Sequence, residues 1–120
     1  MEKIESYRDL KAWQKGMDLA EETYQLAKLL PRTEEYRLTS QLLRAAASVP
    51  ANIAEGHARG TRRDYANFNS IARGSVAETE TFLLLAVRAK LLSEPQAAPA
   101  LKLTGELGKM LNVLLQRLLT

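Results

Sequence analysis

The chain of 120 residues is 46% hydrophobic and 26% charged, and its formal net charge is +3. A domain of this length buries roughly two thirds of its unfolded surface in one core, and the prevalence of Leu and Ala over β-branched residues favours helix over sheet. The sequence contains no cysteine, which excludes disulfides and thiolate metal sites. It also carries no secretory-signal pattern and no apolar stretch long enough to span a membrane. We therefore expect a soluble, cytoplasmic protein with no membrane partner.

The first predicted helix covers about residues 7–30. Its apolar positions alternate at spacings of three and four, which places them along one side of a helix. Ser6 and Asp9 form a capping-box pattern at its start, and Pro31 ends it. The predicted core stripe consists of Leu10, Trp13, Met17, Ala20, Tyr24 and Ala27.

The second predicted helix covers about residues 34–57, with Thr33 as its N-cap. Its apolar stripe consists of Leu42, Ala46, Val49 and Ile53. Pro50 lies inside this helix, where it cannot donate to the carbonyl of Ala46 and its ring crowds that carbonyl. We expect a kink or a restart there with Ser48 as the cap, and Asn52, Arg73 or water as the donor to the carbonyl.

The third and fourth predicted helices cover about residues 62–92 and 96–119. Thr61 with Asp64 and Ser93 with Gln96 repeat the capping-box pattern. Leucines at helical spacing (Leu103, Leu107, Leu111, Leu114 and Leu118) form the stripe of the last helix. Four amphipathic helices with short connections predict a single domain over residues 1–120, an all-α, antiparallel up-down-up-down four-helix bundle.

Small and polar residues gather on facing sides of the second and third helices. We expect this structural polar motif to pack the two helices closely, with its polar groups satisfying one another inside the bundle or at a subunit contact. A ligand-binding role is the alternative. The motif consists of Ser48, Pro50, Asn52, Glu55, Arg73, Gly74, Ser75 and Glu78.

Positive charge is concentrated in the middle of the chain. From Arg32 to Arg73 there are seven basic residues, all arginine, against four acidic ones, whereas the rest of the chain is balanced. Such an excess favours an acidic partner such as RNA or DNA, although a solvated face is the alternative. The candidate nucleic-acid contacts are Arg59, Arg62 and Arg63 in the connection between the second and third helices, together with Arg32, Arg37 and Arg44. The sequence offers no aromatic platform for unpaired bases, so recognition would rest on phosphate and shape.

Several motifs of the chain resemble a known family. In order they are "YRDLKAWQKGMDLAEETYQL", "SQLLRAAASVPANIAEGHARG", "DYANF" and "IARGSVAETETFLLLA". This sequence is similar to the bacterial four-helix-bundle proteins encoded in intervening sequences of 23S rRNA genes. The resemblance runs from Tyr7 to about Leu92. Arg37 stands where the family usually has a small residue, and Lys90 with Leu91 stands where it often has Gly-Tyr.

The resemblance implies a four-helix protomer that assembles into a homo-oligomeric ring, typically a pentamer. The accessory variability protein of diversity-generating retroelements is similar in build, and its basic pentamer engages nucleic acid and a reverse transcriptase. The leucine surplus of the last helix (Leu111, Leu114, Leu115, Leu118 and Leu119) also favours a subunit interface, with a wide core face in a monomer as the alternative.

Three classes of function follow. The first is a non-enzymatic oligomer that binds structured RNA or a ribonucleoprotein. The second is a scaffold or adaptor for a protein such as a reverse transcriptase, without affinity for nucleic acid. The third, an enzyme, is disfavoured because His57 is the only histidine and cannot build a di-metal site, and no nucleophile-base pair is evident. We expect no catalytic residues, no metal and no cofactor.

Overall fold

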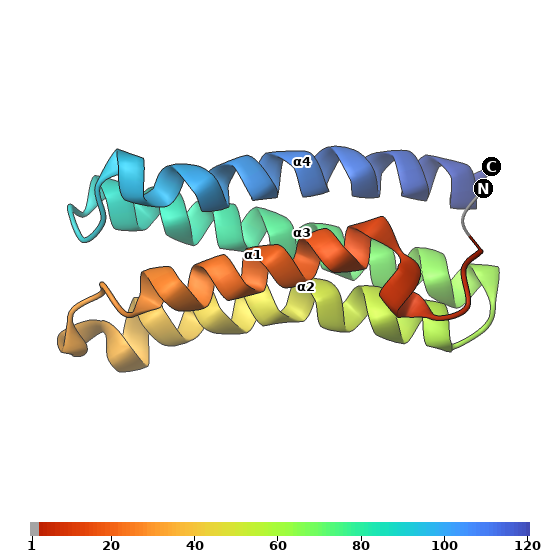
Figure 1. Cartoon of the computed structure of the whole chain (residues 1–120), viewed down its shortest axis with the longest axis horizontal. Coiled ribbons are helices and arrows are strands. Elements are labelled where there is room, and N and C mark those ends of the chain that lie inside the picture. The colour runs from red at the N-terminus through yellow and green to blue at the C-terminus, as the bar shows by residue number, and fades with distance from the viewer. Residues whose placement is uncertain (1–2) are drawn as a thin grey trace.

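The computed structural model describes residues 3–120, and its regular elements there are all helical (Figure 1). Four α-helices and no strand are present within these residues, which confirms the all-α class. The helices are α1 (Lys11–Ala27), α2 (Ser40–Ala58), α3 (Arg62–Arg88) and α4 (Glu94–Leu119), and the shorter elements are the 3-10 helices η1 (Tyr7–Asp9) and η2 (Arg32–Glu34) and the π-helix η3 (Glu35–Thr39). None of the described helices is both long and apolar enough to cross a membrane.

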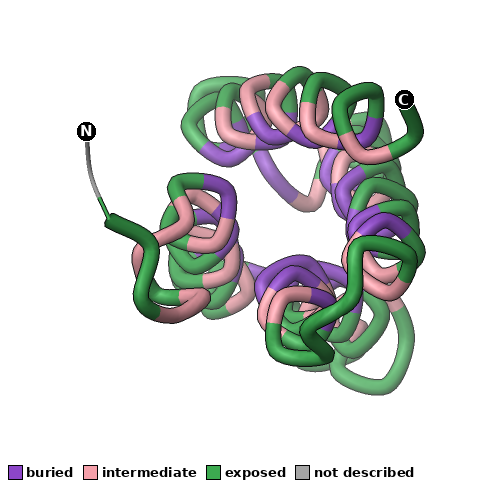
Figure 2. Tube along the Cα trace, turned by 90° about the vertical axis from the view of Figure 1, so that its right-hand side faces the viewer, coloured by how far each residue is buried: buried purple, intermediate pink, exposed green. Residues whose placement is uncertain are grey.

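The four helices pack as a bundle with extents of 43 × 25 × 23 Å. The α1–α2 and α3–α4 connections lie at the left end in Figure 1, and the α2–α3 connection lies at the right end with the C-terminus. Helices that follow one another along the chain pack together, and α1 also contacts α4. Figure 2 looks down the bundle and shows buried residues on the inner side of the helices, so the core runs along the bundle axis.

In each predicted capping-box pair the first residue accepts a hydrogen bond from a backbone N–H, and a complete capping box forms at Ser6 and Ser93 but not at Thr61. The hydroxyl of Ser93 accepts from the backbone N–H of Gln96 at 3.2 Å, and the hydroxyl of Thr61 accepts from that of Asp64 at 3.1 Å. Ser6 and Asp9 also make a capping box, but it caps η1 rather than α1. The α-helix begins at Lys11, after Leu10, whose side chain makes no cap.

The second predicted helix starts later than expected. Thr33 is not an N-cap, because residues 32–39 form a 3-10 turn followed by a π turn. Within the π turn the backbone of Arg37, at φ −121° and ψ −110°, leaves the helical region, so α2 begins only at Ser40. Glu34 and Glu35, expected to open the second helix, lie instead in the 3-10 and π turns that precede α2.

The buried face of α1 differs from the predicted stripe. The helix buries Ala12, Gly16, Leu19, Thr23 and Leu26. Met17 and Tyr24, both predicted to be core residues, are 46% and 52% exposed. Small residues occupy part of the buried face because α1 lies close to α2. A Cβ atom on Gly16 would sit 3.4 Å from the N, Cα and Cβ atoms of Pro50.

Pro50 does not interrupt α2, which runs unbroken from Ser40 to Ala58. The expected restart at Ser48 is therefore wrong, and Pro50 is buried against Gly16 instead. The expected donors to the carbonyl of Ala46 point elsewhere, because the amide of Asn52 donates to the carbonyl of Ser48 at 2.8 Å. The predicted apolar stripe of this helix is confirmed, since Leu42, Ala46, Val49 and Ile53 are all fully buried.

The last two helices are joined by a tight turn. Helix α3 ends at Arg88, four residues before the predicted end, in a turn where Lys90 has a φ of +62°. The backbone N–H of Leu91 donates to the carbonyl of Ala86 at 2.9 Å, and that of Lys90 donates to the carbonyl of Val87 at 3.0 Å. This is the Schellman pattern, which ordinarily places glycine at the left-handed position.

Candidate nucleic-acid interface

The connection between α2 and α3 consists of residues 59–61. Gly60 has a φ of +83°, a conformation that side chains disfavour, and so allows the chain to reverse within three residues. Thr61 then caps α3 and holds the carboxylate of Asp64 at 3.0 Å from its hydroxyl. The turn fixes Arg59, Arg62 and Arg63 at one end of the bundle.

Arg59 is held against the bundle. Its guanidinium donates to the carboxylate of Glu55 at 2.7 Å and lies 5.0 Å from the centre of the Phe68 ring. The hydrogen bond to Glu55 raises the pKa of Arg59 above its ordinary value. Arg59 is thus a partly neutralised cation, and its charge is available to a ligand only in competition with Glu55.

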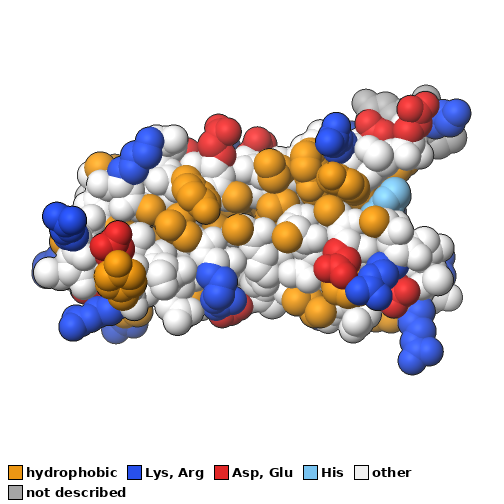
Figure 3. Space-filling view, turned by 90° about the horizontal axis from the view of Figure 1, so that it is seen from below, with side chains coloured by type: hydrophobic (Ala, Val, Ile, Leu, Met, Phe, Trp, Pro, Cys, Tyr) orange, Lys and Arg blue, Asp and Glu red, His pale blue; other side chains and the backbone are white. Residues whose placement is uncertain are grey.

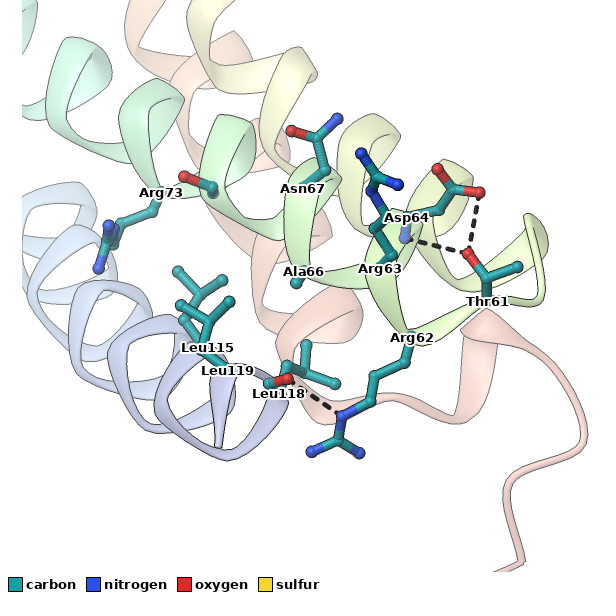
Figure 4. Close-up of a pocket in the computed structure, with 11 residues that line it drawn as sticks. Thr61, Arg62, Arg63, Asp64, Ala66, Asn67, Arg73, Leu115, Leu118 and Leu119 are labelled. Carbon is teal, nitrogen blue, oxygen red and sulfur yellow. Dashed lines mark hydrogen bonds between the residues drawn. The ribbon is translucent and has the colours of Figure 1, made fainter.

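Arg62 has a structural contact that the sequence did not reveal. Its Nε atom donates to the carbonyl of Leu118 at 3.0 Å (Figure 4), and its Nη2 atom donates to the carbonyl of Arg117. These carbonyls belong to the last turn of α4, where carbonyl groups have no N–H partner within the helix. Arg62 therefore caps α4 from the first turn of α3. Local sequence patterns could not reveal this contact, because the two carbonyls are 55 and 56 residues from Arg62 along the chain.

Arg63 and Arg73 lie at a groove between the start of α3 and the end of α4 (Figure 4). The groove has a volume of about 1210 Å³. The guanidinium of Arg73 donates to the side-chain oxygen of Asn112 at 2.9 Å, which directs it toward α4. The lining residues are Thr61, Arg62, Arg63, Asp64, Ala66, Asn67, Ser70, Arg73, Leu115, Leu118 and Leu119.

The other candidate arginines do not join this group. Arg32 and Arg37 are exposed in the α1–α2 connection, at the opposite end of the bundle in Figure 1. Arg44 is paired with Glu78 of α3 at 2.8 Å and also donates to Gln41 at 3.3 Å. The six predicted contacts therefore split into three places, and only Arg62 and Arg63 share the groove, together with Arg73.

The structural polar motif divides in a similar way. The hydroxyls of Ser48 and Ser75 are 2.7 Å apart across the α2–α3 contact, and the amide of Asn52 donates to the Ser48 hydroxyl at 2.8 Å. Gly74 does not take part, because it is exposed and a Cβ atom there would meet nothing within 4 Å. Arg73 turns to α4, and Glu55 and Glu78 hold arginines instead. The motif thus contains a small hydroxyl and amide network within the bundle, and its charged members lie at the surface.

The sequence analysis missed the α4 side of the groove. Asn112, which binds Arg73, and Leu119, which is 75% exposed, belong to the surface that the arginines line. The sequence feature that could have indicated it is the run of leucines at the end of α4, because the core does not bury all of them. Among residues 3–120, no group of three His, Cys, Asp or Glu side chains lies close enough to hold a metal ion.

Comparison with known proteins then decides the family. The profile described as "23S rRNA-intervening sequence protein" matches residues 8–113. The chain belongs to this family. A similar solved structure is the crystal structure of a protein of unknown function from the S23 ribosomal protein family of Bacteroides thetaiotaomicron VPI-5482, with a TM-score of 0.81 and 28% identity over 87% of this chain and 97% of that one. No curated protein matches the sequence.

The match to the 23S rRNA-intervening sequence protein family covers part of the groove. It includes Arg62, Arg63, Arg73 and Asn112, but it ends at residue 113. The leucines at the end of α4 that line the groove, Leu115, Leu118 and Leu119, lie beyond it.

Proposed function

We propose that this chain is a non-catalytic, homo-oligomeric four-helix bundle, antiparallel and up-down-up-down, that binds structured RNA or a ribonucleoprotein. The family description, which refers to 23S rRNA, supports an association with RNA. The nucleic acid would meet the end of the bundle where α2 turns into α3. No metal and no cofactor take part in this proposal.

The observation that carries the proposal is the position of Arg62, Arg63 and Arg73 along the first half of α3. Within residues 3–120 no carboxylate lies within 4.0 Å of these guanidinium groups, whereas Arg44 and Arg59 each have one. Guanidinium groups without an acidic partner attract phosphate, and the positive end of the α3 dipole adds to the attraction. Because Arg62 is committed to α4, Arg63 and Arg73 are the groups we expect to contact phosphate.

Assembly into a ring, which we propose to be a pentamer, would multiply this charge. Five copies of a +3 chain carry +15, and several weak sites on one particle add through avidity. Exposed apolar side chains on α1, including Met17 and Tyr24, offer a surface for self-association. Figure 3 views the molecule from the side where α1 and α2 lie and shows a band of hydrophobic side chains along it, with charged groups at both ends and along its margins.

An anisotropy titration of a labelled RNA hairpin tests the binding proposal. If about five phosphates are contacted, affinity should fall roughly a hundredfold between 50 and 200 mM salt. The double variant Arg63→Ala/Arg73→Ala should bind more weakly and reduce the slope of log affinity against log salt by about 1 to 2. The control is Arg44→Ala, because Glu78 already neutralises that side chain. Absence of binding at low salt, or an equal loss in the control, would remove the proposal.

The mass of the particle in solution tests the ring. A pentamer has a mass of about 67 kDa, five times 13.4 kDa, and light scattering after size-exclusion chromatography measures it directly. The double variant Met17→Ser/Tyr24→Ser should lower the mass. A particle of 13.4 kDa at micromolar concentration would contradict self-association.

A scaffold for a protein partner, for instance a reverse transcriptase, is the second candidate function. The observation that favours it is the leucine side of the groove, since leucines do not bind phosphate. Purified protein with no affinity for RNA at any salt would select this function.

A further inference from the structure

The groove at Arg63 and Arg73 continues along the bundle. A second hollow of about 340 Å³ lies between α3 and α4 and shares Arg73 with the first. It is lined on one side by Ala77 and on the other by Gly105 and Gly108, where a Cβ atom would meet nothing within 4 Å. We call these two hollows together the α3–α4 groove.

The floor of the α3–α4 groove is apolar at its Arg63 end. Leu115 is buried there at 4% exposure, whereas Leu118 is half-buried and Leu119 is 75% exposed. Figure 4 shows Leu115, Leu118 and Leu119 on the α4 side of the groove, between Arg73 and Arg62. No aromatic residue lines this part, so unpaired bases would find no ring to stack on. The floor therefore suits aliphatic side chains better than unpaired bases.

The rim of the same groove is cationic. Arg63, Arg73 and Lys109 line it, and within residues 3–120 none of them has a carboxylate within 4.0 Å. Two acidic residues also line the groove, against four cationic ones, so the lining keeps a net positive charge. Asp64 is bound by the hydroxyl of Thr61 at 3.0 Å, and Glu80 accepts from the hydroxyl of Thr104 at 3.1 Å.

We infer that the α3–α4 groove binds an acidic amphipathic helix of a partner protein. An apolar face on that helix would cover Leu118 and Leu119, and Glu or Asp side chains flanking the face would meet Arg63, Arg73 and Lys109. This is the helix-in-groove mode of recognition, with charge complementarity at the rim setting orientation and specificity. From Arg63 to Ala77 the groove follows fifteen residues of α3, a rise of about 21 Å, so a helix of about 15 residues fits its length.

Gly105 and Gly108 allow this inference to be tested without harming the fold. Because a Cβ atom at either position meets nothing in the chain, a larger residue there should be tolerated and should add helix propensity. Leucine at Gly108 would project into the α3–α4 groove and block it. Gly74 is the matched control, because it is also helical, exposed and open, but it does not line the groove.

The probe is a labelled synthetic peptide of about 15 residues with leucines at i, i+3, i+4 and i+7 and glutamates beside them. We expect saturable binding in an anisotropy titration at 150 mM salt, and at least tenfold weaker binding to Gly108→Leu but not to Gly74→Leu. The charge-reversal pair Arg63→Glu/Arg73→Glu should also weaken binding at least tenfold. The equal charge change Arg32→Glu/Arg37→Glu, at the other end of the bundle, should leave it nearly unchanged.

Two control ligands complete the design. A peptide with every glutamate replaced by lysine should not bind, and one with every leucine replaced by serine should bind at least tenfold more weakly. Equal binding of the lysine peptide, or equal binding to both glycine variants, would overturn the inference. So would loss of the oligomer in Gly108→Leu, which would identify the groove as a subunit contact. If Gly108→Leu lost affinity for the RNA hairpin but not for the peptide, the groove would be a nucleic-acid site instead. The RNA titration of the same variant keeps this inference separate from the proposed function.

Discussion

Gly56 of α2 packs directly against Phe68 of α3. A Cβ atom added to Gly56 would lie 2.8 Å from the Cβ of Phe68, a separation that side chains cannot maintain. We expect Gly56→Ala to lower the free energy of unfolding by about 1 to 3 kcal/mol, although alanine is the better helix former. Gly105→Ala is the matched control, because a Cβ atom there meets nothing within 4 Å. It should raise the free energy of unfolding by up to about 1 kcal/mol. Urea unfolding followed by circular dichroism measures both, and opposite signs are the essential result.

The Ser48–Ser75 contact is expected to couple α2 to α3. Ser75 is only 4% exposed, so removing the Ser48 hydroxyl leaves its hydroxyl without this partner. Ser48→Ala should therefore destabilise the bundle by about 1 to 2 kcal/mol. In a double-mutant cycle the pair Ser48→Ala/Ser75→Ala should cost less than the sum of the single changes. Strict additivity would show that the two hydroxyls act independently.

Lys90 occupies a position that favours glycine. Its φ of +62° places it in the left-handed region at the end of α3. We expect Lys90→Gly to stabilise the protein by about 1 kcal/mol, or about 4 °C in the melting temperature. Lys90→Ala, which removes the charge and keeps the Cβ, serves as the control and should change the melting temperature little. A lower melting temperature for the glycine variant would mean that the lysine side chain contributes a contact of its own.

Arg62 should behave as a structural residue and not as a phosphate contact. Arg62→Ala removes the donors to the last carbonyls of α4, so we expect faster amide hydrogen exchange in the final turns of that helix and a loss of about 1 kcal/mol of stability. The slope of log RNA affinity against log salt should be the same in this variant as in the unsubstituted protein. A reduced slope with unaltered hydrogen exchange would reverse this assignment and place Arg62 among the phosphate contacts.

The lowered pKa values of two carboxylates predict how the stability of the protein varies with pH. The backbone N–H groups of Glu5 and Ser6 lower the pKa of Asp9, and the hydrogen bond from Lys15 lowers the pKa of Glu106. A carboxylate with a lower pKa in the folded state binds fewer protons there than in the unfolded state. Its contribution is therefore complete above the unfolded values of about 4 and disappears as pH falls through the folded ones. Melting curves from pH 7 to pH 3 should show this loss, and it should be smaller in Asp9→Asn/Glu106→Gln.

Local signals in the sequence predicted much of the fold. Two of these features are the caps at Ser93 and Thr61 and the apolar stripe of α2. They depend on residues within a few positions of one another, so the local sequence is enough to predict them. The buried face of α1 is different. Trp13 packs against the core as expected, but Met17 and Tyr24 are exposed, and the buried side of the helix is the one where Gly16 packs against Pro50. Which face is buried depends on how near the neighbouring helix can come, and that distance is a tertiary property.

The candidate site was predictable only in part. The sequence identified the arginines of the α2–α3 connection but could not divide them by partner. Arg59 meets an acid four residues away, whereas Arg62 and Arg73 meet α4 groups that are 55 and 39 residues away. The roles of these arginines are set by how α3 and α4 pack, so residue type alone could not separate a helix cap from a phosphate contact.

The order in which the helices pack also has a consequence for folding kinetics. Three of the principal helix contacts within residues 3–120 join neighbours along the chain, whereas the α1–α4 contact joins the first helix to the last. Low contact order allows rapid folding, because little loop-closure entropy is lost before contacts form. We expect α2 and α3 to associate early, and the α1–α4 seam, bridged by Lys15 and Glu106, to close last. The first helix would then be the part of the chain most exposed to exchange between neighbouring copies during assembly.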